Sequence, residues 1–207
     1  YGLLERDGAT WLARGDEPLM WTDELPLAGG HNLANALAAL ALAEVAGLPL
    51  APCLGALRAF RGLAHRTVLV AEWRGVRWFD DSKGTNPGAT VAALRGLIDP
   101  AGPGRAVLIA GGDGKGADFG ELAETIGHTA RAVILIGRDG PRIDGAIAGR
   151  VPTQLARDMD EAVRLAALVA LPGDAVLLSP ACASFDMFDN YEHRGRVFVA
   201  AVKGLGV

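Results

Sequence analysis

Three continuous apolar runs constrain the fold of this chain more than any other feature. They cover residues 106–110, 132–136 and 175–178, and stretches with helical patterns separate them. Strands that are apolar at every position are typical of parallel sheets, because helices cover both faces of such a sheet. We therefore predict an α/β fold with a Rossmann-like, mostly parallel sheet that carries helices on both faces.

The segment from residue 67 onward alternates between strand and helix patterns. Residues 68–73 and 76–79 predict a hairpin ahead of the apolar strands. Asn86 is a suitable N-cap for the helix that follows, and Asp158 and Glu161 have the spacing of a capping box. The predicted helices cover residues 87–97, 119–126, 142–148, 158–170 and the segment from residue 184 onward.

The first part of the chain has a different pattern. Residues 1–30 form short alternating segments with a hairpin signal at Asp7-Gly8. Helices are predicted at residues 31–46 and 52–60. The predicted domains are therefore residues 1–64 and 65–207. Because the chain starts at Tyr1 rather than at a methionine, we interpret the first domain as the end of a longer one and the chain as a fragment.

Composition and charge exclude several classes of function. The 20 basic and 24 acidic residues give a formal net charge of −4, and no basic cluster indicates nucleic acid binding. No apolar stretch approaches the roughly 20 residues of a membrane helix, so we expect no membrane span and no signal peptide. Cys53 and Cys182 are far apart and lack metal-site spacing, which fits a cytoplasmic protein.

A dense polar loop follows each strand that leads into a predicted helix. The richest is Asp80-Asp81-Ser82-Lys83-Gly84-Thr85-Asn86-Pro87, after the hairpin. The other loops cover residues 111–115, 137–140 and 179–184. The carboxyl ends of parallel strands meet at one edge of a sheet, where open α/β folds bind their ligands. We therefore expect the four loops to form one shared site.

The glycine-rich loop at residues 111–115 is a weak nucleotide motif. Its spacing does not fit a P-loop, because Ile109 stands at the first glycine position and Gly116 replaces the Ser/Thr. It fits a dinucleotide fingerprint equally poorly, so a plain strand-to-helix turn is the simpler interpretation. Lys115 argues against that interpretation, since an ammonium at a strand end is well placed to bind a carboxylate or a phosphate.

Other polar residues of these loops are binding candidates with structural alternatives. Asp81 suits a ribose hydroxyl or a metal, while Lys83 and Thr85 suit an anion, but all three could belong to a solvated turn. Ser184 is expected at the N-terminus of the last helix, where it could bind an anion or only cap the helix. We interpret its neighbour Cys182 as a buried thiol.

Further candidates lie outside these loops. Asn32 and Asn35 are three residues apart on a predicted helix, so their amides share a face and could contact an adenine edge. The alternative is an N-cap and one exposed amide. Arg66 lies at the predicted domain boundary and could contact a phosphate or form an interdomain salt bridge. We expect Phe185 and Tyr191 in the core or in a pocket wall.

Five motifs occur here in the order and spacing of one known family. They are His31-Asn32-Leu33-Ala34-Asn35-Ala36-Leu37-Ala38-Ala39, His65-Arg66, Asp81-Ser82-Lys83-Gly84-Thr85-Asn86, Gly111-Gly112-Asp113-Gly114-Lys115 and Ser179-Pro180-Ala181-Cys182-Ala183-Ser184. On these motifs the chain resembles the Mur ligases of peptidoglycan synthesis, from the end of their central ATPase domain through their C-terminal domain. The loop at residues 81–86 is similar to that of the members that add D-glutamate.

The resemblance implies an ATP-dependent amide ligation. The carboxylate of UDP-N-acetylmuramoyl-L-alanine would become an acyl phosphate, and the amine of D-glutamate would attack it. The implied contacts are Thr85, Lys115, Ser184, Phe185 and Tyr191 for D-glutamate, and Asn32, Asn35, Arg66 and Asp81 for the nucleotide, with catalytic roles for Lys83 and Lys115. Tyr191 departs from the phenylalanine of the family, which should preserve packing, and Gly84 departs from alanine, which we expect to be minor.

The resemblance also implies parts that precede residue 1. These are the P-loop, the Mg²⁺ ligands, a carbamylated lysine and the domain for the uridine nucleotide. We therefore expect ATP and Mg²⁺ as cofactors of the full-length protein, a monomer, no metal site in this chain and no activity of the 207-residue chain alone. Two alternatives stay open: another Mur-type or folylpolyglutamate-type ligase, and a non-catalytic nucleotide-binding module.

Overall fold

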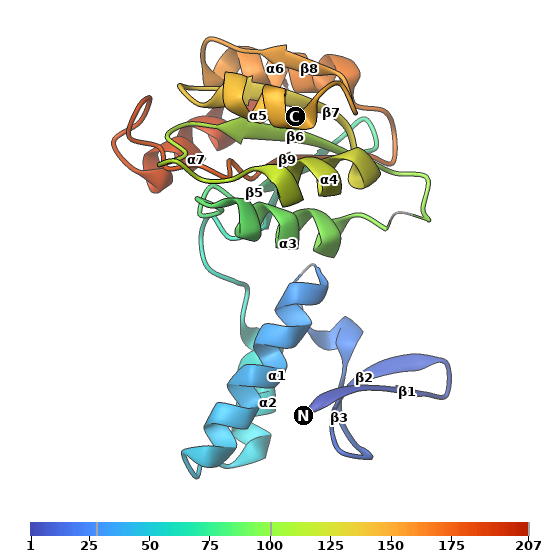
Figure 1. The fold of residues 1–207 in the computed structure, drawn as a ribbon. Coiled ribbons are helices and arrows are strands. Elements are labelled where there is room, and N and C mark those ends of the chain that lie inside the picture. The colour runs from blue at the N-terminus through green and yellow to red at the C-terminus, as the bar shows by residue number, and fades with distance from the viewer. Residues whose placement is uncertain (28, 100, 207) are drawn as a thin grey trace. The chain divides into compact units, whose positions relative to one another are not determined.

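The chain divides into two units, Tyr1–Gly62 and Leu63–Val207, as Figure 1 shows. The structure, a computed structural model, describes residues 1–27, 29–99 and 101–206. The division falls two residues before the boundary predicted between residues 64 and 65. The assignment of the first unit to the end of an ATPase domain stays a prediction.

A three-stranded antiparallel sheet and two helices form the first unit. Its elements are β1 (Gly2–Arg6), β2 (Ala9–Arg14), β3 (Glu17–Trp21), the 3₁₀-helix η1 (Thr22–Glu24), α1 (Gly30–Val45) and α2 (Leu50–Ala59). The hairpin predicted at Asp7-Gly8 is confirmed, since β1 and β2 pair antiparallel across it. Helix α2 begins two residues before the predicted Pro52, because proline is tolerated in a first turn, where its missing N–H costs no helix bond.

A six-stranded sheet is the centre of the second unit. Its strands are β4 (Val68–Trp73), β5 (Val76–Asp80), β6 (Ala106–Gly111), β7 (Ala130–Ile136), β8 (Thr153–Leu155) and β9 (Ala175–Leu178). The strand order is β4-β5-β9-β6-β7-β8, and only β4 runs antiparallel to its neighbour. The predicted α/β fold with a mostly parallel sheet is therefore confirmed. The short strand β8 was not predicted.

Helices cover both faces of this sheet. They are α3 (Pro87–Leu97), α4 (Gly120–Thr129), α5 (Gly140–Ile147), α6 (Met159–Val169) and α7 (Tyr191–Lys203). Leu108 on β6 packs in one buried cluster with residues of α3, α4 and α5, whereas its neighbour Ile109 packs in another with residues of α6 and α7. Successive strand side chains point to opposite faces, so a strand buried on both faces must be apolar throughout.

Side-chain caps set the starts of two helices where they were predicted. Asn86 accepts a hydrogen bond from the N–H of Ala89 at 2.9 Å at the start of α3. Asp158 accepts one from the N–H of Glu161 at 2.7 Å at the start of α6. The reciprocal half of the predicted capping box is wrong, because the Glu161 carboxylate accepts from the N–H of Arg157 instead. The cap is one-sided but still satisfies a free N–H group.

The prediction that the last helix begins at Ser184 is wrong. Helix α7 begins at Tyr191, and the side chain of Asn190 accepts a hydrogen bond from the N–H of His193 at 2.7 Å as its cap. Residues 184–190 form turns and bends instead. One reason is that the Asp186 carboxylate accepts from the N–H of Arg138 on a neighbouring loop, which holds this segment along the sheet edge. Ser184 therefore caps no helix.

Candidate functional site

The four polar loops lie at the carboxyl ends of four neighbouring parallel strands. They follow β5, β9, β6 and β7, which are adjacent in that order. We call these loops together the four-loop edge: residues 81–86, 179–184, 111–116 and 137–140. In Figure 1 the loop between β9 and α7 emerges at this edge beside the end of β5. The arrangement follows from strand direction alone, as expected for an open α/β sheet.

Backbone hydrogen bonds connect the loops of the four-loop edge to one another. The N–H of Ala181 donates to the carbonyl of Gly84 at 2.9 Å. Asp113 and Ala183 exchange two bonds, each of 2.9 Å, so the Lys115 loop lies beside Ser184. The N–H of Asp139 donates to the carbonyl of Gly112 at 2.9 Å. These bonds satisfy buried backbone groups and hold the loops as one structure.

Asp81 is buried and makes three hydrogen bonds within the chain. One carboxylate oxygen accepts from the N–H and the hydroxyl of Thr67, both at 3.1 Å, and the other accepts from the hydroxyl of Ser179 at 2.7 Å. Burial raises the pKa of this carboxyl to about 6, although the three donors oppose the rise. Asp81 therefore connects the residue before β4 to the loop after β9, and its contact with a ribose stays a prediction.

The segment around Arg66 is strained and is held by both aspartates of the loop. His65 and Thr67 have φ values of 62° and 53°. Positive φ values are uncommon for residues other than glycine and are rarest for β-branched residues such as threonine. The ring of His65 contacts the Asp80 carboxylate at 2.7 Å, and Thr67 is held by Asp81. Strain of this kind persists only where neighbours impose it, often at functional sites. Arg66 itself is exposed between these two anchored residues.

The glycine at position 84 has little room for a side chain, and the expectation that its exchange for alanine is minor stays a prediction. A Cβ on Gly84 would lie 2.5 Å from the hydroxyl oxygen of Ser179 and 2.6 Å from a carboxylate oxygen of Asp81. Both distances are below any normal contact, so an alanine would displace the hydrogen bond between these side chains. With glycine at this position, the buried hydrogen bond between Ser179 and Asp81 is left undisturbed.

Arg194 on α7 is a central residue of the site that the sequence analysis missed. It is fully buried and donates three hydrogen bonds: to the hydroxyl of Ser82 at 3.0 Å, to the carbonyl of Ser82 at 2.8 Å and to the carbonyl of Cys182 at 3.1 Å. Burial lowers the pKa of its guanidinium to about 10. One side chain thus connects two loops of the four-loop edge. The only sequence signal is an arginine within the otherwise buried face of the last helix.

Lys83 and Lys115 present ammonium groups at this edge. The Lys83 nitrogen lies 4.0 Å from the ring centroid of Tyr191, and the Lys115 nitrogen lies 5.9 Å from that of Phe185. The salt bridges within the described part of the chain include neither lysine. Asp113, next to Lys115, pairs instead with Arg138. Both ammonium groups are therefore available to an anionic ligand.

The remaining predicted residues of this unit have varied surroundings. Ser184 is buried and Thr85 is half-buried. Phe185 is 69% exposed, so it does not belong to the core, and it contacts Lys115 instead. Cys182 is fully buried, which confirms the interpretation as a buried thiol, and burial raises the pKa of this thiol to about 12.

Asn32 and Asn35 belong to the first unit. Both lie near the start of α1, where Asn35 is exposed and Asn32 is half-buried. The alternative that one of them caps the helix is wrong, because the N-cap is Gly29, which adopts φ 96°. Their contact with an adenine stays a prediction.

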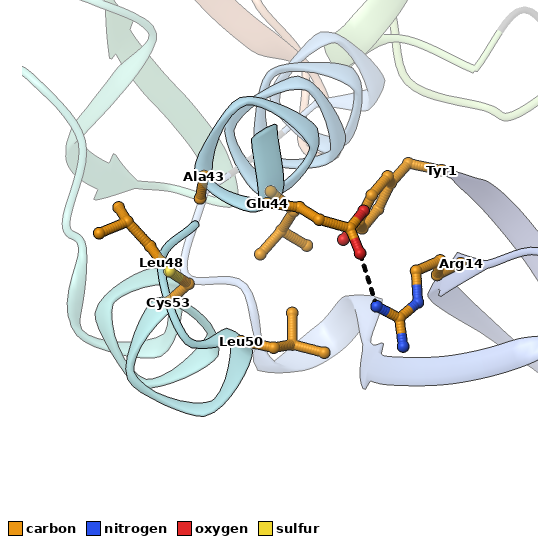
Figure 2. Close-up of a pocket in the computed structure, with 8 residues that line it drawn as sticks. Tyr1, Arg14, Ala43, Glu44, Leu48, Leu50 and Cys53 are labelled. Carbon is orange, nitrogen blue, oxygen red and sulfur yellow. Dashed lines mark hydrogen bonds and ion pairs between the residues drawn. The ribbon is translucent and has the colours of Figure 1, made fainter. Parts of the chain in front are cut away.

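A small pocket of about 130 Å³ also lies in the first unit, as Figure 2 shows. The ion pair between Arg14 and Glu44, 2.7 Å long, forms part of its wall. Its lining residues are Tyr1, Arg14, Leu40, Ala43, Glu44, Leu48, Leu50 and Cys53, none of which is a predicted site residue.

The described residues carry neither a metal-binding cluster nor a membrane-spanning helix. Residues 1–27, 29–99 and 101–206 contain no group of three or more His, Cys, Asp or Glu side chains that could hold a metal ion. None of the helices in these ranges combines the length and the apolar character that a membrane crossing requires.

The strand order defines an α/β domain of the Rossmann type, with polar loops at the carboxyl edge of its sheet. The model of the family "Mur ligase, glutamate ligase domain" matches residues 65–182. The chain belongs to the Mur ligase family.

Relatives agree with this assignment, and solved structures share the fold. The chain is 60% identical over 209 residues to the UDP-N-acetylmuramoylalanine–D-glutamate ligase of Aromatoleum aromaticum, and 56% identical over 203 residues to that of Nitrosococcus oceani. These matches cover 99% and 98% of this chain but 44% of each relative, so the chain spans less than half of their length. MurF ligase from Thermotoga maritima in complex with ADP shares the fold, with a TM-score of 0.62 at 16% identity over 99% of this chain and 45% of that one.

Proposed function

We propose that the full-length protein joins D-glutamate to UDP-N-acetylmuramoyl-L-alanine in an ATP-dependent reaction, and that the four-loop edge binds D-glutamate. The observation that carries this proposal is the pair of ammonium groups, Lys83 and Lys115, on connected loops without carboxylate partners among the described residues. The names of relatives at 51–60% identity support the choice of amino acid.

The groups at this edge suit an amino acid with two carboxylates. In the proposed complex, Lys115 and the hydroxyls of Thr85 and Ser184 bind the carboxylates of D-glutamate, while the rings of Phe185 and Tyr191 exclude water around it. Hydrogen bonds to charged groups are stronger than neutral ones, and an ammonium with no competing carboxylate loses none of that strength. Binding fixes the amine of D-glutamate in position to attack.

Lys83 suits a different step of the proposed reaction. A carboxylate is a poor electrophile, and ATP supplies the phosphoryl group that provides it with a leaving group. Negative charge then grows on the reacting oxygens as the amine attacks. A fixed ammonium near those oxygens stabilises that charge without reorganising solvent. Lys83 supplies such a group from the loop that Asp81, Ser82 and Arg194 hold in place.

The proposed complex also needs residues that bind the nucleotide and side chains that hold Mg²⁺. Arg66 has an exposed guanidinium that fits a phosphate, and Asn32 and Asn35 have amides that fit an adenine edge. Because the described residues hold no metal-binding group, we propose that the Mg²⁺ ligands belong to the rest of the full-length protein. A cytoplasmic location and a monomeric state stay predictions from the sequence.

The test is made on the full-length protein, by following ADP release with UDP-N-acetylmuramoyl-L-alanine and one amino acid at a time. D-glutamate, L-glutamate, L-lysine, diaminopimelate and L-alanine are compared. We expect turnover with D-glutamate alone, and a loss of about 10- to 100-fold in kcat/KM for Lys115→Ala, the effect of one lost charged hydrogen bond. Lys203→Ala is the matched control, since Lys203 is exposed at the end of α7.

Each alternative has its own result in this assay. Turnover with a different amino acid would keep the ligase but reject the D-glutamate site. Nucleotide binding without turnover would favour the non-catalytic nucleotide-binding module. ADP release by the 207-residue chain alone would contradict the expectation that this chain is inactive without the rest of the protein.

A further inference from the structure

The ammonium of Lys83 has an aromatic ring as its partner. Its nitrogen lies 4.0 Å from the ring centroid of Tyr191, well inside the roughly 6 Å range of cation–π interactions. A carboxylate partner would compete with an anionic ligand, whereas a neutral ring orients the ammonium and leaves its charge intact. The contact with Lys115 is looser, at 5.9 Å, and Phe185 is 69% exposed.

The position of Tyr191 is determined by contacts that do not involve Lys83. Its backbone carbonyl accepts a hydrogen bond from the hydroxyl of Ser82 at 2.7 Å, and that hydroxyl accepts from Arg194 at 3.0 Å. Its phenol hydroxyl donates to the carboxylate of Glu192 at 3.1 Å. The ring of His65 lies edge-on to it, with the centroids 6.2 Å apart. The ring is therefore held in place before any ligand binds.

The backbone of Lys83 is fixed as well. Its N–H donates to the carbonyl of His65 at 3.0 Å, and the loop around it is tied to Arg194 through Ser82. Only the four-carbon side chain is left to be oriented, and such a chain has a high rotamer entropy. Among the described residues, the Tyr191 ring is the group that restricts the Lys83 side chain.

We propose that Tyr191 is the positioning residue for Lys83, and that its ring face holds the ammonium at the four-loop edge for the ligation step. The proposal rests on the proposed function, because the value of a positioned ammonium depends on a reaction that develops negative charge there. It concerns the ring and not the phenol hydroxyl, since the hydroxyl points to Glu192.

The chain is well suited to a direct test of this contact. It has three lysines, Lys83, Lys115 and Lys203, so the signals of their ε-CH₂ groups can be assigned with two variants, Lys83→Arg and Lys203→Arg. In the 207-residue chain we expect an upfield ring-current shift of the Lys83 ε-protons, kept in Tyr191→Phe and lost in Tyr191→Leu. Lys203 is the internal control.

Both substitutions leave the Ser82 bond in place, because Ser82 contacts the backbone of Tyr191. Dispersed amide signals from β6 and β9 will show that each variant is folded. A Lys83 shift that is unchanged in folded Tyr191→Leu would overturn the proposal, and so would the loss of the shift in Tyr191→Phe.

The kinetic test uses the full-length protein. For Tyr191→Leu we expect kcat to fall about two- to thirtyfold, the range of a cation–π contact, with a smaller change in KM for D-glutamate. Tyr191→Phe should keep most of kcat, because it retains the aromatic ring. The fall should also disappear when Lys83→Met is already present, because the two residues act as one unit. Equal losses in Tyr191→Phe and Tyr191→Leu would assign the effect to the hydroxyl and refute the proposal.

The two tests separate the two hypotheses. If the full-length protein does not ligate D-glutamate, the proposed function is rejected. The NMR shift would still decide whether the ring of Tyr191 orients Lys83.

Discussion

Replacing Arg194 by methionine should destabilise the second unit more than any exposed substitution on the same helix. Methionine fills a similar volume but donates no hydrogen bond, so the carbonyls of Ser82 and Cys182 lose their donor in a buried site. A buried polar group without a partner costs about 1–3 kcal/mol, which gives about 2–6 kcal/mol for two carbonyls. Removing a buried charge returns part of this, so we expect a loss of about 2–4 kcal/mol.

Hydrogen exchange of the β5 and β9 amides measures this loss. It reports the opening free energy of the second unit itself, which matters because a chain of two units need not unfold in one step. The matched control is Arg196→Met, since Arg196 is exposed two positions further along α7 and should change the free energy by no more than about 0.5 kcal/mol. Equal losses in the two variants would refute the view that Arg194 connects the loops.

Three further predictions concern the same edge. Burial raises the pKa of Asp81 to about 6 from the 3.8 of a free aspartate, so the stability that this group contributes is present below about pH 4 and falls by about 3 kcal/mol as pH rises through 6. Asp81→Asn should remove this slope from urea titrations between these pH values, and an unchanged slope would exclude Asp81 as its source. Gly84→Ala should cost about 1–3 kcal/mol by hydrogen exchange, because its Cβ would separate Asp81 from Ser179, and a neutral effect would mean that the loop adapts. In a thiol titration of the folded chain, half-buried Cys53 should react well before Cys182, and equal rates would contradict the burial of Cys182.

Much of the second unit could be predicted because its signals are local. An apolar run such as residues 106–110 is buried wherever it pairs, and Asn86 caps a helix through a neighbour three positions away. The gathering of the four loops was also predictable, since parallel strands share one direction. The start of α7 was not, because Asn190 and Ser184 are both good caps and the contact of Asp186 with Arg138 decided between them.

The sequence by itself determined most of the strands and helices and the edge of the sheet on which the polar loops lie, because each follows from periodicity, capping and strand direction. Only the tertiary structure decided the interior of the site. The insertion of β9 between β5 and β6 brings Ser179 to Asp81, and α7 brings Arg194 to Ser82, 112 residues away along the chain. Contacts between such distant residues depend on which strands pair and which helix covers them, and no local pattern carries that information.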